Sequence, residues 1–255
     1  MRGMLGLLVA GLLAGCAPTF VSTDPAVPRS EKEALLVLPG LRNSLRGHRA
    51  AKRFYPGHGY DVFIPDYVSR DGLDGSVANL EAFISEHRLK EYRKVHAFVH
   101  VMGGWSLNKY LGDQPFPNLE TVVYNRSPLQ EQAPRIYLEN MPRIVNLIFG
   151  EAVKDMRDTP YPELAKGDRK IAMIIETRAT PYVRRHRDQV VYDGARSWTP
   201  ESFGQEHDDR IYVFLHHDEI YYRLDEFGDE LMAFLREGKF TDEAARKPAE
   251  GDPFR

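Results

Sequence analysis

Short apolar runs alternate with segments of helical periodicity along most of this chain. Six runs are mainly apolar, as strands buried on both faces of a sheet are. They lie at residues 34–38, 60–64, 95–101, 119–124, 171–175 and 211–215. Apolar side chains recur at helical spacing between and after these runs, most clearly at residues 77–84, which Ser76 would cap, and at residues 224–235. The alternation predicts a mostly parallel sheet with helices on both faces.

One segment, residues 126–168, interrupts this alternation after the fourth strand. It has little strand character, and its residues 141–149 predict an amphipathic helix. Parallel sheets bind ligands at the carboxyl ends of their strands, which is where such an insert begins. The sequence leaves two interpretations open, a lid over the site or a purely structural excursion.

The N-terminus is typical of an exported protein. Arg2 precedes an apolar run at residues 5–13, which is too short to cross a bilayer as a helix and which predicts a signal peptide over residues 1–15. The stretch Leu13-Ala14-Gly15-Cys16 resembles the bacterial lipobox. This resemblance implies cleavage before Cys16 and a lipid on that residue. It also implies a place in the bacterial cell envelope, in the outer membrane of a Gram-negative host because Ala17 follows.

Composition indicates one domain between two polar ends. The 255 residues are 42% hydrophobic and 28% charged, enough for a single globular core over residues 34–240. Residues 16–33 contain several prolines and predict a flexible tether, and residues 241–255 predict a charged tail. The net charge of -3 gives no argument for binding nucleic acid, and the single cysteine excludes an intramolecular disulfide.

The third strand ends in Val99-His100-Val101-Met102-Gly103-Gly104. This segment resembles the nucleophile elbow of the α/β hydrolases, commonly G-H-S-M-G-G, in which serine stands on a sharp turn between strand and helix. Val101 occupies the serine position. The resemblance covers about residues 34–240, is closest to bacterial lipase-like hydrolases, and implies the α/β-hydrolase fold without cofactor or metal. Leu38-Pro39-Gly40-Leu41 resembles the oxyanion loop, which implies an oxyanion region at Gly40, Leu41 and Met102.

The same resemblance implies places for the other two members of a catalytic triad. Asp188 stands in a segment similar to the acid motif, and His217 fits the histidine position better than His216 does. The order of elbow, acid and histidine is that of the α/β hydrolases. Because valine has neither a proton to lose nor a lone pair, the serine acyl-enzyme mechanism cannot run at Val101. Ser106, expected in the early turns of the following helix, is the alternative nucleophile.

Four arginines fall within ten residues next to the presumed acid motif. They are Arg178, Arg184, Arg185 and Arg187. Arginine suits the recognition of carboxylates and phosphates, so this segment is either an anion-binding site or a solvated basic face near anionic lipid.

The sequence thus favours a membrane-anchored, catalytically degenerate hydrolase-fold protein that binds a small or lipid-like ligand or another envelope protein. The alternative is an active carboxylic-ester hydrolase that uses Ser106 or a water activated by His217. A structural envelope component is the third hypothesis.

Overall fold

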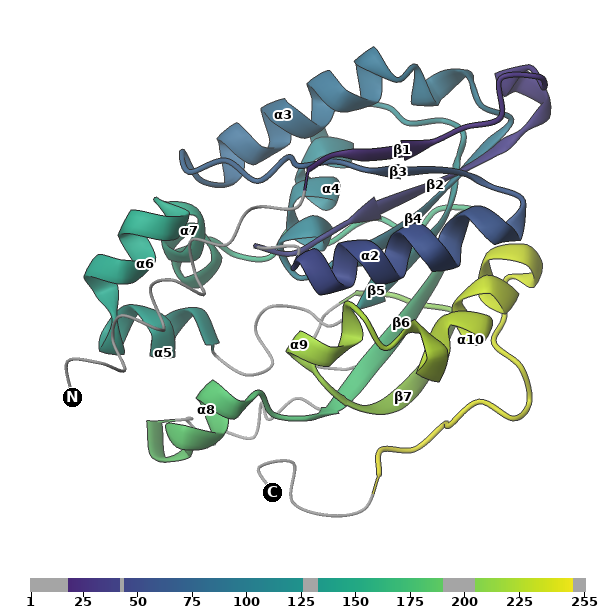
Figure 1. Cartoon of the computed structure of the whole chain (residues 1–255). Helices are drawn as coiled ribbons and strands as arrows, with labels where there is room; N and C mark the ends of the chain where they lie inside the picture. The colour runs from purple at the N-terminus through teal and green to yellow at the C-terminus, as the bar shows by residue number, and fades with distance from the viewer. Residues whose placement is uncertain (1–17, 42–43, 126–132, 190–204, 250–255) are drawn as a thin grey trace.

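The computed structural model describes residues 18–41, 44–125, 133–189 and 205–249, and these residues form a seven-stranded sheet. Its order is β1-β3-β2-β4-β5-β6-β7, with only β1 antiparallel to its neighbour (Figure 1). The strands are β1 (Phe20–Ser22), β2 (Glu33–Leu38), β3 (Asp61–Ile64), β4 (Lys94–His100), β5 (Leu119–Asn125), β6 (Lys170–Arg178) and β7 (Asp209–His216). The six predicted strands and the parallel sheet are therefore confirmed.

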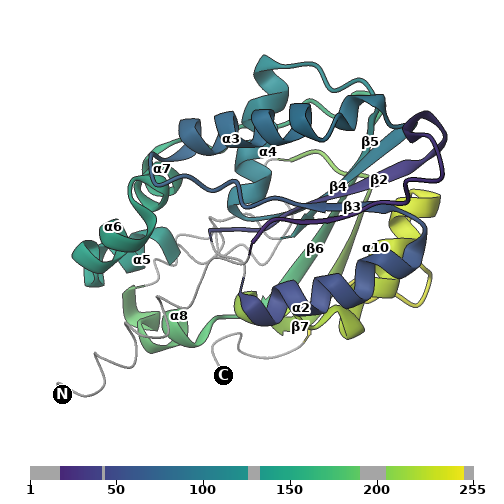
Figure 2. The same cartoon turned by 45° about the horizontal axis from the view of Figure 1, so that its top comes forward.

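Helices cover both faces of the sheet, as predicted. Figures 1 and 2 show α2 and α10 on one face and α3 and α4 on the other. The described helices are α2 (Leu45–Phe54), α3 (Leu73–Glu86), α4 (Met102–Asp113), α5 (Ala133–Asn140), α6 (Pro142–Phe149), α7 (Ala152–Asp158), α8 (Pro181–Arg185), α9 (His217–Ile220) and α10 (Leu224–Glu237). Short 3₁₀ turns are η1 (Arg29–Glu31), η2 (Tyr55–His58), η3 (Leu89–Glu91) and η4 (Arg187–Gln189).

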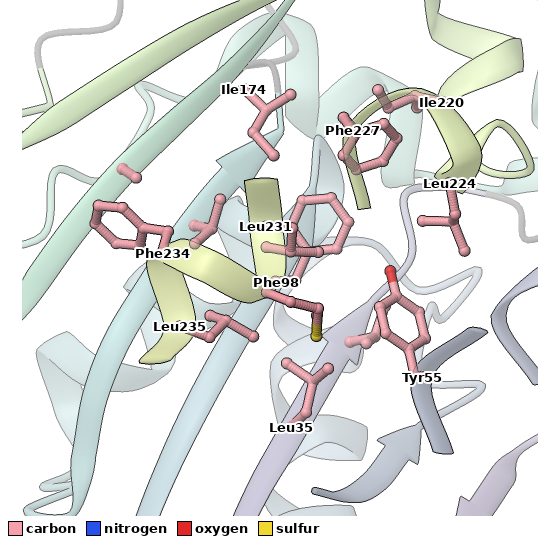
Figure 3. Close-up of a cluster of buried hydrophobic side chains, with 14 of the residues drawn as sticks. Leu35, Tyr55, Phe98, Ile174, Ile220, Leu224, Phe227, Leu231, Phe234 and Leu235 are labelled. Carbon is pink, nitrogen blue, oxygen red and sulfur yellow. The ribbon is translucent and has the colours of Figure 1, made fainter. Parts of the chain in front are cut away.

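Two apolar cores result because successive side chains of a strand point to opposite faces. On one face Leu35 and Phe98 meet Leu231 and Phe234 of α10, together with Tyr55 (Figure 3). On the other face the next residues along β2 and β4 pack against α3 and α4. Each large apolar side chain buried in this way contributes about 1.5–3 kcal/mol.

Helix α3 begins earlier than its apolar pattern predicts. Ser76 is not its cap but lies within the helix, where its hydroxyl donates to the carbonyl oxygen of Gly72 at 2.7 Å. The predicted helix at residues 141–149 is present as α6. It belongs to a run of three short helices, α5 to α7, that connects β5 to β6.

The segment predicted as a tether is largely part of the folded domain. β1 pairs with β3 at the edge of the sheet. The ammonium of Lys32 lies 2.5 Å from the buried carboxylate of Asp61, which also accepts from the amide of Asp24 at 3.0 Å. The prolines in this segment predicted an extended chain. An edge strand is also extended, so the same prolines are compatible with β1. The folded domain therefore begins before residue 34, while residues 16 and 17 lie outside the described ranges.

The first part of the predicted charged tail is also docked. Ala244 is buried in the core beside α10, and the amide of Tyr212 in β7 donates to the carbonyl oxygen of Ala245 at 2.9 Å. Arg246 forms an ion pair with Asp209. These contacts cover part of the outer edge of β7, whose backbone groups would otherwise be unpaired.

No helix in the described ranges is long and apolar enough to span a bilayer. The predicted signal peptide, Cys16 and residues 250–255 lie outside those ranges.

Candidate functional site

Val101 lies on a strained turn between β4 and α4. Its φ is 42° and its ψ is -103°. A positive φ is a genuine outlier for a β-branched residue, and such strain costs about 1–3 kcal/mol. A Cβ on Gly103 would lie 2.5 Å from the carbonyl oxygen of Leu38, so glycine is what lets α4 approach β2 this closely. The backbone thus forms the sharp strand-to-helix turn of an elbow, with valine at its tip.

His217 follows β7 directly and is paired with a buried acid. Its Nδ1 lies 3.1 Å from Oε1 of Glu176, which is fully buried near the end of β6. Hydrogen bonding of Nδ1–H to this carboxylate leaves Nε2 as the acceptor nitrogen. Glu176 and His217 therefore have the relation of acid and base in a hydrolytic triad.

The expected pairing of Asp188 with His217 is not the one found. Asp188 lies in η4, beyond α8, with an exposed side chain. The physical reason is the length of β6, which continues to Arg178 and so brings Glu176 to the carboxyl edge beside His217. A carboxylate directly after the apolar run at residues 171–175 was the sequence signal for it.

Tyr221 places its hydroxyl between His217 and Gly40. The phenol oxygen lies 3.4 Å from Nε2 of His217 and accepts from the amide of Gly40 at 3.2 Å. A Cβ on Gly40 would lie 2.5 Å from this oxygen. Burial raises the pKa of Tyr221, so the hydroxyl is neutral and can donate to His217 while accepting from Gly40. Sequence reasoning missed Tyr221. Its position one helical turn after His217 could have indicated that the two side chains lie close together.

Aromatic and polar contacts hold the Tyr221 ring and the oxyanion loop in place. The ring of His100 stacks on Tyr221, with centroids 4.6 Å apart, and its Nδ1 lies 2.9 Å from Oδ1 of Asn125. Burial lowers the pKa of His100 to about 4, so this ring is neutral near neutral pH. The hydroxyl of Tyr67 donates to the carbonyl oxygen of Pro39 at 2.6 Å.

The insert covers this arrangement with apolar side chains. Ala152 and Met156 of α7 belong to one cluster with Met102, against which Val101 and Leu41 pack. A side chain of α7 also fixes the insert, because Asp155 Oδ2 accepts from the amide of Leu73 at 2.7 Å. The insert therefore packs against the elbow and Leu41, an arrangement that both the lid and the structural excursion would give.

Ser106 is fully buried in the second turn of α4. Within the described part of the chain, no hydrogen bond joins it to His217. A serine in this position lacks both the base and the access that a nucleophile needs.

The four arginines separate into two groups. Arg178 ends β6, where it forms an ion pair with Glu219 at 3.4 Å and lies over the ring of Phe214. The other three lie on α8 and η4, where the side chains of Arg185 and Arg187 are exposed and that of Arg184 is partly exposed. A search of the described residues finds no group of three or more His, Cys, Asp or Glu side chains that could hold a metal ion.

Comparisons with known proteins show the fold. Neither the sequence models of protein families nor the sequences of curated proteins match this chain. A metagenome-derived lipolytic enzyme matches with a TM-score of 0.53 and 14% identity, over 88% of this chain and 99% of the other.

Two further solved structures agree. Est1E from Butyrivibrio proteoclasticus matches with a TM-score of 0.51 and 13% identity, over 86% of this chain and 93% of its own. The mature Bacillus licheniformis lipase BlEst2 matches with a TM-score of 0.51 and 13% identity, over 87% and 99%. The order of the strands, the elbow and these similarities together show that the chain has the α/β-hydrolase fold of lipases and esterases.

Proposed function

We propose that this protein is a lipid-anchored, catalytically inactive hydrolase-fold protein of the bacterial envelope that binds a ligand or partner instead of hydrolysing esters. The observation that carries the proposal is Val101 at the tip of the elbow. Acyl transfer at this place needs an atom with a lone pair, and the side chain of valine has none.

A second observation concerns the groups that would stabilise a transition state. An oxyanion hole depends on N–H donors directed at the developing charge. The amide of Gly40 is already bound to the phenol oxygen of Tyr221, and the same oxygen contacts Nε2 of His217. One hydroxyl thus engages both the base and an oxyanion donor. This contact also disfavours a water activated by His217, because Nε2 has a partner.

The surroundings of the elbow favour an apolar, lipid-like ligand over a polar one. Leu41 packs against both apolar clusters beneath the insert, and Met102 lies in one of them. Behind Tyr221, a cavity of about 20 Å³ lined by His100 and Pro39 has room for about one water. This small cavity is itself too small for a ligand larger than water.

The test is labelling with a serine-directed fluorophosphonate together with hydrolysis of p-nitrophenyl acetate. We expect no labelling and no turnover above that of buffer, and the same result for Ser106→Ala. Labelling that Ser106→Ala abolishes would overturn the proposal and make Ser106 the nucleophile. Turnover without labelling that is lost in His217→Gln would overturn it in favour of the activated water.

The proposed anchor has its own test, since the lipid and the missing nucleophile are independent claims. In a bacterial host, mass spectrometry of the mature protein should find an N-terminal Cys16 that carries a lipid. A mature chain that starts elsewhere, or an unmodified Cys16, would contradict the anchoring part of the proposal.

A further inference from the structure

The position of β1 limits where a membrane anchor can lie. β1 runs antiparallel to β3, and Phe20 pairs with Ile64 at the carboxyl end of β3. Cys16 precedes Phe20 by four residues, which span at most about 14 Å. With a lipid on Cys16, a condition that rests on the proposed function, the bilayer lies close to the carboxyl edge of the sheet.

The same edge carries α5, α6 and α8 as one surface. The insert follows β5 and α8 follows β6, so both leave the carboxyl ends of their strands, and Figures 1 and 2 show them at one end of the molecule. The rings of Tyr137 in α5 and Tyr182 in α8 stack in parallel with centroids 4.3 Å apart. Leu138 of α5 and Val145 of α6 share an apolar cluster.

Helix α6 exposes apolar side chains on its outer side. Leu147 is 69% exposed, the largest exposed fraction among the large hydrophobic residues that the structure describes. Ile144, three residues before Leu147, is partly exposed, as is Ile148 one turn after Ile144, while Val145 faces the insert's own core. The outer side of this amphipathic helix thus combines the exposed Leu147 with the polar Arg143 and Asn146, a mixed face that suits a membrane interface.

Helices α6 and α8 carry only basic charges, whereas exposed acidic side chains lie beside them at Glu139 of α5, Glu151 and Asp188. Helix α6 contains Arg143 and no acidic residue, and α8 contains Arg184 and Arg185 and no acidic residue. An apolar face bordered by basic side chains is the pattern of segments that lie in the interface of an anionic membrane. Arginine also binds phosphate oxygens through several N–H donors at once.

We propose that the carboxyl edge of the domain docks on the anionic bilayer to which the chain is anchored. Leu147 inserts between lipid headgroups, and Arg143, Arg184 and Arg185 bind lipid phosphates. The elbow under the insert then faces the membrane, so that a lipid-like ligand reaches the site from the bilayer.

The first experiment uses a chain that begins at Pro18, because residues 18–249 contain every described strand and the helices that cover the sheet. This chain lacks Cys16, the only cysteine, so a substitution introduces a unique thiol. Leu147→Cys is labelled with an environment-sensitive fluorophore and mixed with vesicles of phosphatidylcholine and phosphatidylglycerol in equal parts. We expect a blue shift and brighter emission.

The matched control is Val27→Cys. Val27 is 37% exposed and lies in the turn between β1 and η1, at the opposite edge of the sheet. The emission of a fluorophore at this position should be that of a water-exposed label both with and without vesicles. Equal shifts at both positions, or no shift at either, would overturn the docking proposal.

The second experiment tests the charges by vesicle sedimentation. Each arginine near an anionic surface strengthens binding about fivefold, so Arg184→Glu with Arg185→Glu should weaken partition by at least about twentyfold. Arg53→Glu, at the exposed end of α2 on the opposite edge, is the control and should change little. Equal losses in both variants would overturn the assignment of this face.

The two proposals fail separately. Fluorophosphonate labelling and ester hydrolysis are measured without vesicles and report only on the nucleophile. The anchor-free chain reports only on the docking face, so a failure there contradicts the orientation and leaves the inactive elbow untouched.

Discussion

A hydroxyl restored at position 101 should give little esterase activity unless the phenol of Tyr221 is also removed. Val101→Ser supplies a nucleophile on an elbow whose backbone already has the required turn. The phenol oxygen still contacts Nε2 of His217 at 3.4 Å and the amide of Gly40 at 3.2 Å. The new serine would compete with it for the base, and the tetrahedral intermediate would compete with it for the oxyanion donor.

The expected gain in kcat on removing the Tyr221 hydroxyl can be worked out from its contact with the amide of Gly40. Loss of one oxyanion donor costs about 10²–10³ in kcat, or about 3–4 kcal/mol. Tyr221→Phe keeps the ring that stacks on His100 and removes only the hydroxyl. Val101→Ser combined with Tyr221→Phe should therefore exceed Val101→Ser alone by about two orders of magnitude in kcat. Tyr221→Phe alone should stay inactive.

Initial rates with p-nitrophenyl acetate measure the effect, and fluorophosphonate labelling counts the reactive serines. Thermal unfolding shows whether each variant is folded. His217→Gln, added to the double variant, is the control that should abolish the gained activity, because the base is then missing.

Two outcomes would refute the reasoning. If Val101→Ser alone is as active as the double variant, the phenol of Tyr221 does not block the site. If the folded double variant neither labels nor turns over, Glu176 and His217 are not poised for catalysis, and the remnant has lost more than its serine.

Three further predictions concern stability and processing. Burial lowers the pKa of His100 to about 4, against 6.5 for an ordinary histidine. The free energy of unfolding should therefore fall by about 3 kcal/mol as the pH drops from 6.5 to 4. Urea denaturation at a series of pH values should show that His100→Gln removes this pH dependence. Asp61→Asn leaves Lys32 without its buried counter-charge and should cost about 3 kcal/mol in the same assay. Globomycin, an inhibitor of lipoprotein signal cleavage, should cause a larger precursor with its leader still before Cys16 to accumulate, which mass spectrometry would detect.

The core and the elbow could be predicted because their signals are local. A strand buried on both faces is apolar throughout, and the turn at residue 101 needs the small residues that follow it, of which Gly103 meets β2 directly. Position 101 could thus be found even though its side chain had changed. The family resemblance placed His217 over His216 near the end of the last predicted strand, and the structure pairs His217 with a buried carboxylate.

The positions of Glu176 and Tyr221 depend on how distant segments pair with one another, which local sequence patterns do not predict. Whether Glu176 or Asp188 meets His217 is decided by how far β6 continues beside β7, and a bulge between the two strands falls at this point. Tyr221 reaches Gly40 across a separation of 181 residues. Prolines likewise indicated extended chain before residue 34, without showing that β1 would join the sheet.

The contact between Glu176 and His217 also has a structural role. Glu176 is fully buried, and His217 holds it through Nδ1. Loss of a hydrogen-bond partner from a buried polar group costs about 1–3 kcal/mol, so the contact stabilises the fold whether or not the histidine acts as a base. Through Tyr221 the same contacts continue to Gly40 and tie the ends of β6, β7 and β2 together. These contacts help to hold the carboxyl edge rigid enough to sustain a strain of about 1–3 kcal/mol at Val101, a conformation that this side chain would not adopt alone.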